Sequence, residues 1–361
     1  VCNGRSTRTM RPALAFILCL KVLFLIGACA PYSDARRRGD PRIAGSEQQR
    51  SLVREAGALH REPLQALGLS LDFAHEAALR LRADPGDGAA IADYNFAVAR
   101  VVEAVAEGGL EPWHAPVKSP SQDDRTWELA TTEGSPCPQF RFSDFAYRPA
   151  DRYEFRGELT KGSAARAGVG APVIAVGRSA DFLEIDRFAQ GEQIFYGLTA
   201  VLHFEGSVCR LEFYDPLEFE SVAFAGESAP LAADFKAPLA LKLAEMNPRR
   251  RQLSRMFRPR RYNGDARLAR LQPYRPDRIP VLFIHGLGNS PATWMPVVSF
   301  LRADPTVRKH YQFWFFCHPT GIPYPISAAS LRRQLDEMGL RHPDRKKLVV
   351  IGHSMGGMIA R

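Results

Sequence analysis

The end of the chain carries the feature that most constrains its fold, an alternation of apolar strands and amphipathic helices. After Pro280, VLFIH is a continuous apolar run of the kind found in strands that are buried on both faces. Helical sequence over 291–301 follows, then the strand QFWFFC, a helix over 327–338, the strand KLVVIG and a helix that opens with MGGMIAR. This β-α-β-α-β-α order predicts an α/β fold with a parallel sheet and helices packed on its faces.

The third of these strands runs directly into the pentapeptide Gly352-His353-Ser354-Met355-Gly356. In a chain with 28 glycines the pattern G-x-S-x-G alone is weak evidence, so the flanking elements must decide its meaning. Here a strand precedes it and a helix follows. A serine in such a tight turn has its Oγ lifted above the sheet, in the arrangement called a nucleophile elbow. The context therefore predicts Ser354 as a catalytic nucleophile, and the alternative is a plain glycine-rich turn.

A second motif, FIHGL, closes the first strand of the alternation and ends at Leu287. Elbow hydrolases stabilise the tetrahedral oxyanion with two backbone N–H groups. One belongs to the residue after the nucleophile, here Met355, and the other to the loop after this strand, where Leu287 is the best match. His285 is predicted to be structural, because the acid and the histidine of such triads follow the nucleophile.

Three motifs carry a resemblance to a known family: IPVLFIHGLGNSPATW, YQFWFFCHPTG and VVIGHSMGGMIAR. Residues 279–361 resemble the first part of an α/β-hydrolase of the lipase/esterase type. The chain is also similar to large bacterial lipoprotein hydrolases that carry an added N-terminal region. The resemblance implies hydrolysis of carboxylic esters, among them lipid or acyl esters, through an acyl-serine intermediate. It implies no cofactor and no metal.

The sequence departs from the family pattern after the elbow, because only seven residues follow Ser354. We therefore expect a truncated hydrolase sheet that lacks the acid and the histidine and has little activity by itself. Its uncovered edge is expected to make it poorly stable or prone to aggregation. The upstream residues His310, His318 and His342 are not expected to replace the missing base.

The N-terminus predicts export and membrane attachment. After Met10-Arg11, an apolar run ends in Ile26-Gly27-Ala28-Cys29, and a basic start, a short apolar core and small residues are typical of a signal peptide. The last four residues resemble the bacterial lipobox, in which the cysteine is lipidated. Residues 1–29 are thus interpreted as upstream residues and a lipoprotein signal peptide. Cys29 would anchor the protein to a membrane of the bacterial cell envelope, and an uncleaved membrane anchor is the alternative.

The middle of the chain is predicted to hold a helical segment followed by a β-rich domain. The expected units are a tether at 30–47, a helical hairpin region at 48–108, a polar loop at 109–135, a β-rich domain ending in a helix at 136–246, an arginine-rich connector at 247–278 and the hydrolase part at 279–361. A β-hairpin is expected at Glu205-Gly206-Ser207. Cys137 and Cys209 could form a disulfide in an oxidising compartment, which sequence spacing cannot decide.

Charge and cysteine content exclude several classes of protein. The net charge of +9 is confined to residues 247–278, which hold 11 arginines and two aspartates. A nucleic-acid-binding domain would show a distributed basic face, so nucleic acid is not an expected partner. This segment is expected to be a solvated connector or, alternatively, to contact anionic membrane headgroups. The six cysteines include no CxxC pair, which argues against a structural metal.

Two rival functions stay open at this point. One keeps the enzyme but changes the acceptor, which makes it an acyltransferase or a thioesterase. The other is a cell-envelope binding lipoprotein with a catalytically dead hydrolase-like domain.

Overall fold

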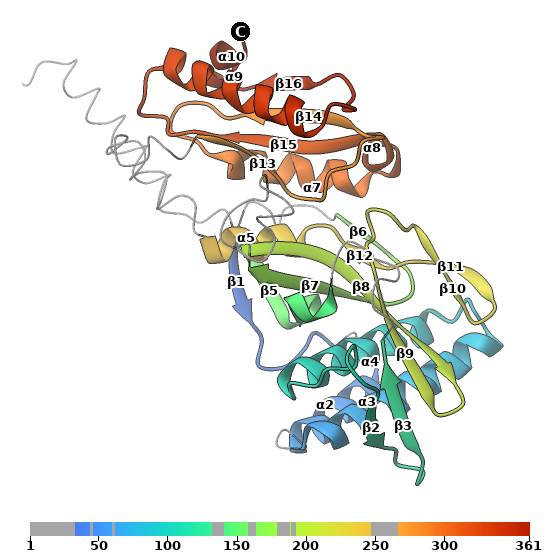
Figure 1. The fold of residues 1–361 in the computed structure, drawn as a ribbon. Helices are drawn as coiled ribbons and strands as arrows, with labels where there is room; N and C mark the ends of the chain where they lie inside the picture. The colour runs from blue at the N-terminus through green and yellow to red at the C-terminus, as the bar shows by residue number, and fades with distance from the viewer. Residues whose placement is uncertain are drawn as a thin grey trace, which may run out of the picture.

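The computed structural model describes residues 33–43, 46–59, 62–131, 141–157, 164–178, 188, 193–246 and 266–361. Cys29, Cys137 and the segment 247–265 lie outside the described residues. Two sheets organise the molecule, a six-stranded sheet in the first part of the chain and a four-stranded sheet at its end (Figure 1). Within the described ranges, no helix combines the length and apolar character needed to cross a membrane.

Three helices pack beside the six-stranded sheet: α2 (Glu47–Ala58), α3 (Pro63–Ala83) and α4 (Gly88–Glu107). The carboxylate of Asp87 caps α4 by accepting hydrogen bonds from the N–H groups of Ala89 and Ala90, as expected for an N-cap aspartate. Tyr94 of α4 is fully buried, and its hydroxyl donates to the carbonyl of Leu202 at 2.7 Å and accepts from the N–H of the same residue at 2.8 Å. The helical segment and the sheet therefore share one core.

The six-stranded sheet has the order β2-β3-β9-β8-β7-β4. Its strands are β2 (Val117–Pro120), β3 (Thr126–Ala130), β4 (Phe145–Pro149), β7 (Ala171–Arg178), β8 (Gln193–Glu205) and β9 (Val208–Tyr214). A hairpin joins β8 to β9 with Gly206 at φ 64°, in the turn that the sequence indicates. Strands β2 and β3 arise where a polar loop was expected, because Trp127 and Leu129 alternate into the core and are fully buried.

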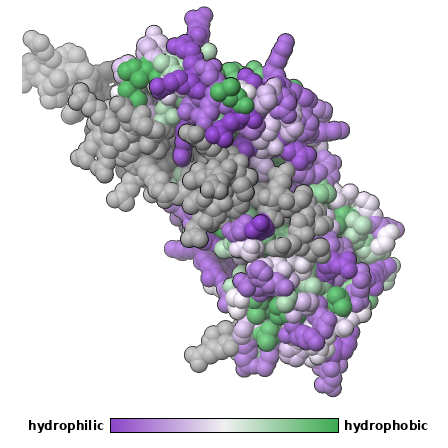
Figure 2. All heavy atoms as spheres, in the orientation of Figure 1, coloured by the Kyte–Doolittle hydropathy of each residue, from purple (hydrophilic) through white to green (hydrophobic). Residues whose placement is uncertain are grey.

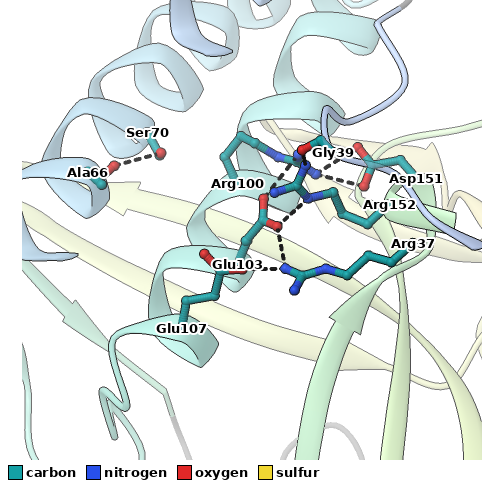
Figure 3. Close-up of polar contacts among 9 residues, drawn as sticks. All are labelled: Arg37, Gly39, Ala66, Ser70, Arg100, Glu103, Glu107, Asp151 and Arg152. Atoms are coloured by element: carbon teal, nitrogen blue, oxygen red, sulfur yellow. Dashed lines mark hydrogen bonds and ion pairs between the residues drawn. The ribbon is translucent and has the colours of Figure 1, made fainter. Parts of the chain in front are cut away.

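The segment expected to be a tether is in part folded. Strand β1 (Ser33–Arg37) pairs antiparallel with β5 (Tyr153–Gly157). Figure 3 shows an ion-pair network that holds this ribbon to α4, in which Glu103 accepts from Arg37 and from Arg152. Arg100 lies beside it, 2.7 Å from a carboxylate oxygen of Asp151. The interpretation of 30–47 as a tether is therefore corrected over Ser33–Arg37, because strand pairing and ion pairs with α4 fix this stretch to the domain.

Shorter elements complete the first part of the chain. Two small antiparallel ribbons are formed by β6 (Ala165–Arg166) with β12 (Ala233–Asp234), and by β10 (Ser221–Phe224) with β11 (Glu227–Pro230). Single 3-10 turns lie at η1 (Phe142–Asp144) and η2 (Ala150–Arg152). Cys209 is a buried free thiol, and burial raises its pKa to about 12.

The four-stranded sheet has the order β13-β15-β14-β16. In chain order, the strands and the helices of this C-terminal part are β13 (Arg267–Arg270), β14 (Ile279–Ile284), η6 (Pro291–Trp294), α7 (Met295–Ala303), α8 (Pro305–His310), β15 (Tyr311–Cys317), α9 (Tyr324–Arg341), β16 (Val349–Gly352) and α10 (Met355–Ala360). β14 runs parallel to both β15 and β16, which is the parallel sheet that the alternation predicts. β13 is antiparallel to β15 and was not expected, since it falls inside the predicted connector.

Helix α5 (Ala237–Met246) lies between the two sheets (Figure 1). Leu239, Ala240 and Leu243 pack with the core of the four-stranded sheet, whereas Ala237 and Leu241 pack against the six-stranded sheet. One amphipathic helix therefore contributes to two cores.

Two described arginines of the predicted connector are buried, whereas Arg267 is exposed and Arg275 is half-buried. Arg270 is buried with its guanidinium over the rings of Tyr274 and Trp314. Arg278 is also buried and donates to both carboxylate oxygens of Glu218 at 2.8 Å. Free solvation is therefore wrong for these two residues, because Arg270 is buried against rings of the C-terminal part and Arg278 against Glu218 of the preceding part. The expectations for the arginines at 249–261 fall outside the described residues.

Candidate active site

The turn between β16 and α10 places Ser354 in an unusual backbone conformation. Its φ of 55° and ψ of −123° lie in a region that non-glycine residues rarely occupy. Such a conformation costs on the order of 1–3 kcal/mol and persists only where the surrounding structure enforces it. This is the tight strand-to-helix turn that the pentapeptide predicts, with the serine at its apex.

Two glycines make this turn possible. A Cβ atom at Gly352 would lie 2.6 Å from the backbone carbon and oxygen of Gly356. A Cβ atom at Gly356 would lie 2.3 Å from the carbonyl oxygen of Ile284, at the end of β14. Because both neighbours are backbone atoms, neither can move aside for a larger side chain. The spacing of the motif thus reflects packing between the elbow and the neighbouring strand.

The loop after β14 meets the elbow at Gly286. The N–H of His353 donates to the carbonyl of Ile284 at 3.0 Å, and a Cβ at Gly286 would lie 3.0 Å from Cβ of Ser354. In the described part of the chain, no hydrogen bond is made by the N–H of Leu287 or by that of Met355. The two predicted donors are therefore open, and they belong to the two loops that meet at the serine.

Leu287 belongs to a tight turn that a second loop supports. The N–H of Asn289 donates to the carbonyl of Gly286 at 3.2 Å, and Gly288 at the third position has φ 67°, as in a type II turn. The N–H of Gly288 donates to Oγ1 of Thr320 at 3.2 Å. Thr320 is buried in the loop after β15, so the carboxyl ends of two adjacent parallel strands form this part of the site.

Two buried histidines lie beneath this turn. The rings of His285 and His318 are stacked, with centroids 4.2 Å apart and planes inclined by 7°. Burial lowers the pKa of His318, against the opposing effect of backbone carbonyls at His285 and Pro319. His285 was singled out in the sequence, but the contribution of His318 and Thr320 was missed. The available signal was the HPT triplet at the end of a strand predicted to run parallel to VLFIH.

The other upstream histidines lie in separate surroundings. The ring of His342 is stacked on Tyr274 with centroids 3.7 Å apart, and Nδ1 of His310 lies 2.8 Å from the carbonyl of Thr306. Over residues 266–361, no hydrogen bond joins Ser354 to a histidine or a carboxylate. The described residues therefore hold a serine and two open N–H donors without a general base beside them, and no group of metal-ligating side chains occurs among them.

Most aromatic residues near the site belong to the core. Phe313, Trp314 and Phe315 are buried within β15, and Trp294 packs on Phe283 with ring centroids 4.9 Å apart. Exposed apolar side chains instead occur on the loops at the carboxyl ends of the strands, at Leu287 (53% exposed) and in the first turn of α9 at Tyr324 and Ile326. On the face drawn in Figure 2, the C-terminal part is mostly hydrophilic and carries small hydrophobic patches.

Comparison with known proteins gives one family match. Residues 281–361 match the alpha/beta hydrolase family, which covers β14 to α10 and includes the elbow and the Leu287 loop. No curated protein and no solved structure matches the chain. The match supports a hydrolase domain at the end of the chain and leaves the preceding region without a counterpart.

Proposed function

We propose that the protein is a serine hydrolase that cleaves carboxylic esters, with Ser354 as the nucleophile. The observation that carries the proposal is the strained backbone of Ser354 beside two open N–H groups, from Leu287 and Met355. A plain glycine-rich turn gives no reason to hold a serine at positive φ or to leave both donors unused. The family match over residues 281–361 agrees with a hydrolase in general.

In the proposed reaction, Oγ of Ser354 attacks the ester carbonyl carbon while a base takes the hydroxyl proton. The carbonyl oxygen becomes an oxyanion and accepts hydrogen bonds from the N–H groups of Leu287 and Met355. Removal of one such donor typically lowers the rate about 100- to 1000-fold. The leaving alcohol departs with a proton, and water then hydrolyses the acyl-serine. The proposal requires a histidine and a carboxylate from outside the described residues.

The exposed apolar residues that follow β14 and β15 favour an apolar acyl or lipid ester as substrate. Leu287, Tyr324 and Ile326 would contact the substrate at the carboxyl ends of the strands, where ligands of such folds bind. An acyltransferase or a thioesterase would use the same residues. Product analysis with water, alcohol and thiol acceptors separates these activities.

Covalent labelling tests the proposed nucleophile. The full-length protein should react with a fluorophosphonate probe, and the modified peptide should contain Ser354. Ser354→Ala should abolish labelling, whereas Ser327→Ala, at a buried serine of α9, should leave it intact. A correctly folded protein that is not labelled at Ser354 would show that this domain is catalytically dead, as in the binding-lipoprotein alternative.

We also propose that the protein is attached to the cell envelope through lipidated Cys29. Only Ala30, Pro31 and Tyr32 separate this cysteine from β1, which is paired to β5. Four residue steps span at most about 14 Å, so the first domain would lie close to the membrane surface. Cys29→Ser should release the protein from the membrane fraction, and unchanged fractionation would contradict the anchor.

A further inference from the structure

The buried pair His285 and His318 donates hydrogen bonds to two successive carbonyls of the loop that carries Leu287. Nε2 of His318 lies 3.3 Å from the carbonyl oxygen of His285, and Nδ1 of His285 lies 3.2 Å from that of Gly286. A carbonyl oxygen only accepts hydrogen bonds. The contacts therefore require His318 to carry its proton on Nε2 and His285 to carry its proton on Nδ1.

These contacts determine the direction of the peptide between Gly286 and Leu287. In a trans peptide the carbonyl and the following N–H point in opposite directions. The carbonyl of Gly286 is held by Nδ1 of His285 and by the N–H of Asn289. The N–H of Leu287 is consequently held on the other side of the peptide, away from the histidine. A peptide flip would break both hydrogen bonds.

The stacked arrangement favours neutral rings. The two imidazoles are almost parallel and are 2% and 3% exposed, so a charge on one ring would be desolvated and would lie against the other. The ring of Phe316 packs against His318 with centroids 5.2 Å apart, which fixes the second imidazole from β15. The pair thus links the carboxyl ends of β14 and β15 through neutral, directional hydrogen bonds.

We infer that His285 and His318 act as positioning residues, which hold the Leu287 N–H in the direction needed to stabilise the oxyanion. The inference rests on the proposed function, because it assigns a supporting role to residues around the same nucleophile. Neither histidine exchanges a proton with substrate in this role. Their effect is on the orientation of a backbone donor.

Matched variants separate the hydrogen bonds from the packing. His318→Phe keeps a ring for stacking but removes the Nε2 donor, and His318→Gln places an amide donor near the same point. His285→Phe and His285→Asn form the corresponding pair for Nδ1. The measurement is the rate of Ser354 phosphonylation by a fluorophosphonate in the full-length protein, with thermal unfolding recorded for each variant.

We expect each phenylalanine variant to react at least about tenfold more slowly than wild type, since a misaligned donor loses much of its effect. The glutamine and asparagine variants should recover most of that rate. Phenylalanine variants that melt like wild type and react at the wild-type rate would overturn the inference. So would equal losses in all four variants, because packing alone would then explain them.

A second measurement does not depend on activity. Nitrogen-15 NMR of labelled histidines should show His285 protonated on Nδ1 and His318 protonated on Nε2, both in the neutral state at pH 7. The opposite tautomer at either residue would overturn the inference whatever the labelling rates. If wild type is not labelled at Ser354, the proposed function fails, and the tautomers alone decide whether the pair holds the loop.

Discussion

Two strands of the C-terminal sheet have nearly the same composition and opposite environments. In β14, Val281, Leu282, Phe283 and Ile284 are all buried, whereas in β16 the residues Val349, Val350 and Ile351 are all exposed by 39–43%. The strands are adjacent and parallel, with Leu282 opposite Val350. β14 has strands on both sides, but β16 is the edge strand of the described sheet. An apolar run therefore predicts a strand, while its neighbours determine whether that strand is buried.

The apolar residues of the six-stranded sheet are covered more completely than those of the four-stranded sheet. Helices α3 and α4 share one core cluster with part of the sheet, and Ile174, Val176 and Phe195 of the sheet pack instead against α5. The two sheets are joined by α5 and by ion pairs, among them Arg308 with Glu220 at 2.8 Å. The apolar residues of the first region are therefore covered by helices. In the second region α5 covers one side of the four-stranded sheet, and the edge strand β16 is exposed.

The largest expected contrast is between two facing residues of β14 and β16. Leu282→Ala should lower the free energy of unfolding by about 3 kcal/mol, because Leu282 is 1% exposed and its removal leaves a cavity. Val350→Ala should cost about 0.5 kcal/mol, since its side chain is 41% exposed. Denaturant unfolding of both variants measures the difference. Equal losses would mean that β16 is covered in solution.

A glycine pair tests whether the first region is closely packed throughout. A Cβ at Gly68 of α3 would lie 1.7 Å from the carbonyl oxygen of Pro120, so Gly68→Ala should destabilise by about 3 kcal/mol. Gly57 of α2 has no atom within 4 Å of that position, so Gly57→Ala should stabilise by about 0.5–1 kcal/mol. Thermal unfolding of both variants checks this. Because α5 contributes residues to both cores, Gly68→Ala should also lower the melting temperature of the C-terminal sheet.

The contact between the regions is tested at Glu218. Glu218→Gln leaves Arg278, whose side chain is 6% exposed, without its carboxylate. Breaking a buried pair costs about 3–5 kcal/mol, but Glu218 is 26% exposed, so we expect about 2 kcal/mol. The control Glu47→Gln removes an exposed pair with Arg50 and should change stability by less than about 0.5 kcal/mol. Thermal unfolding measures both variants, and equal melting temperatures would show that this contact does not hold the regions together.

The effect expected at Lys242, which α5 buries between the sheets, is a dependence of stability on pH. Burial lowers the pKa of its amine to about 7, with nearby Arg267 and Arg302 acting in the same direction and Cys317 opposing them. The unfolded amine titrates near its ordinary value of 10.5. Between these values the unfolded chain binds a proton that the folded chain does not, so stability should rise with pH from 7 to about 10.

Lys242→Met should abolish that rise and stabilise the protein by about 1 kcal/mol at pH 7. Urea unfolding of both proteins at pH 7 and pH 9 measures the two slopes. A wild-type protein whose stability does not change over this range would contradict the buried position of the amine.

Local patterns in the sequence account for the strands β14, β15 and β16, the helices between them, the hairpin at Gly206 and the elbow at Ser354. Each depends on residues close together in the chain: apolar runs, glycines at fixed spacing, and a serine between a strand and a helix. Near the candidate site, the two open N–H groups follow from the same motifs. These features could be predicted because their physical causes act over a few residues.

Other features were decided by contacts between distant parts of the chain. β13 joins the sheet because Leu268 and Ala269 become buried there, although the surrounding sequence is rich in arginine. Glu103 fixes the stretch Ser33–Arg37 through Arg37, which precedes it by 66 residues, and through Arg152, which follows it by 49 residues. The stacking of His285 on His318 depends on the pairing of β14 with β15. Sequence by itself determined which elements form and where the serine lies; the tertiary structure decided their neighbours, because burial, ion pairing and ring stacking depend on residues that only the fold brings together.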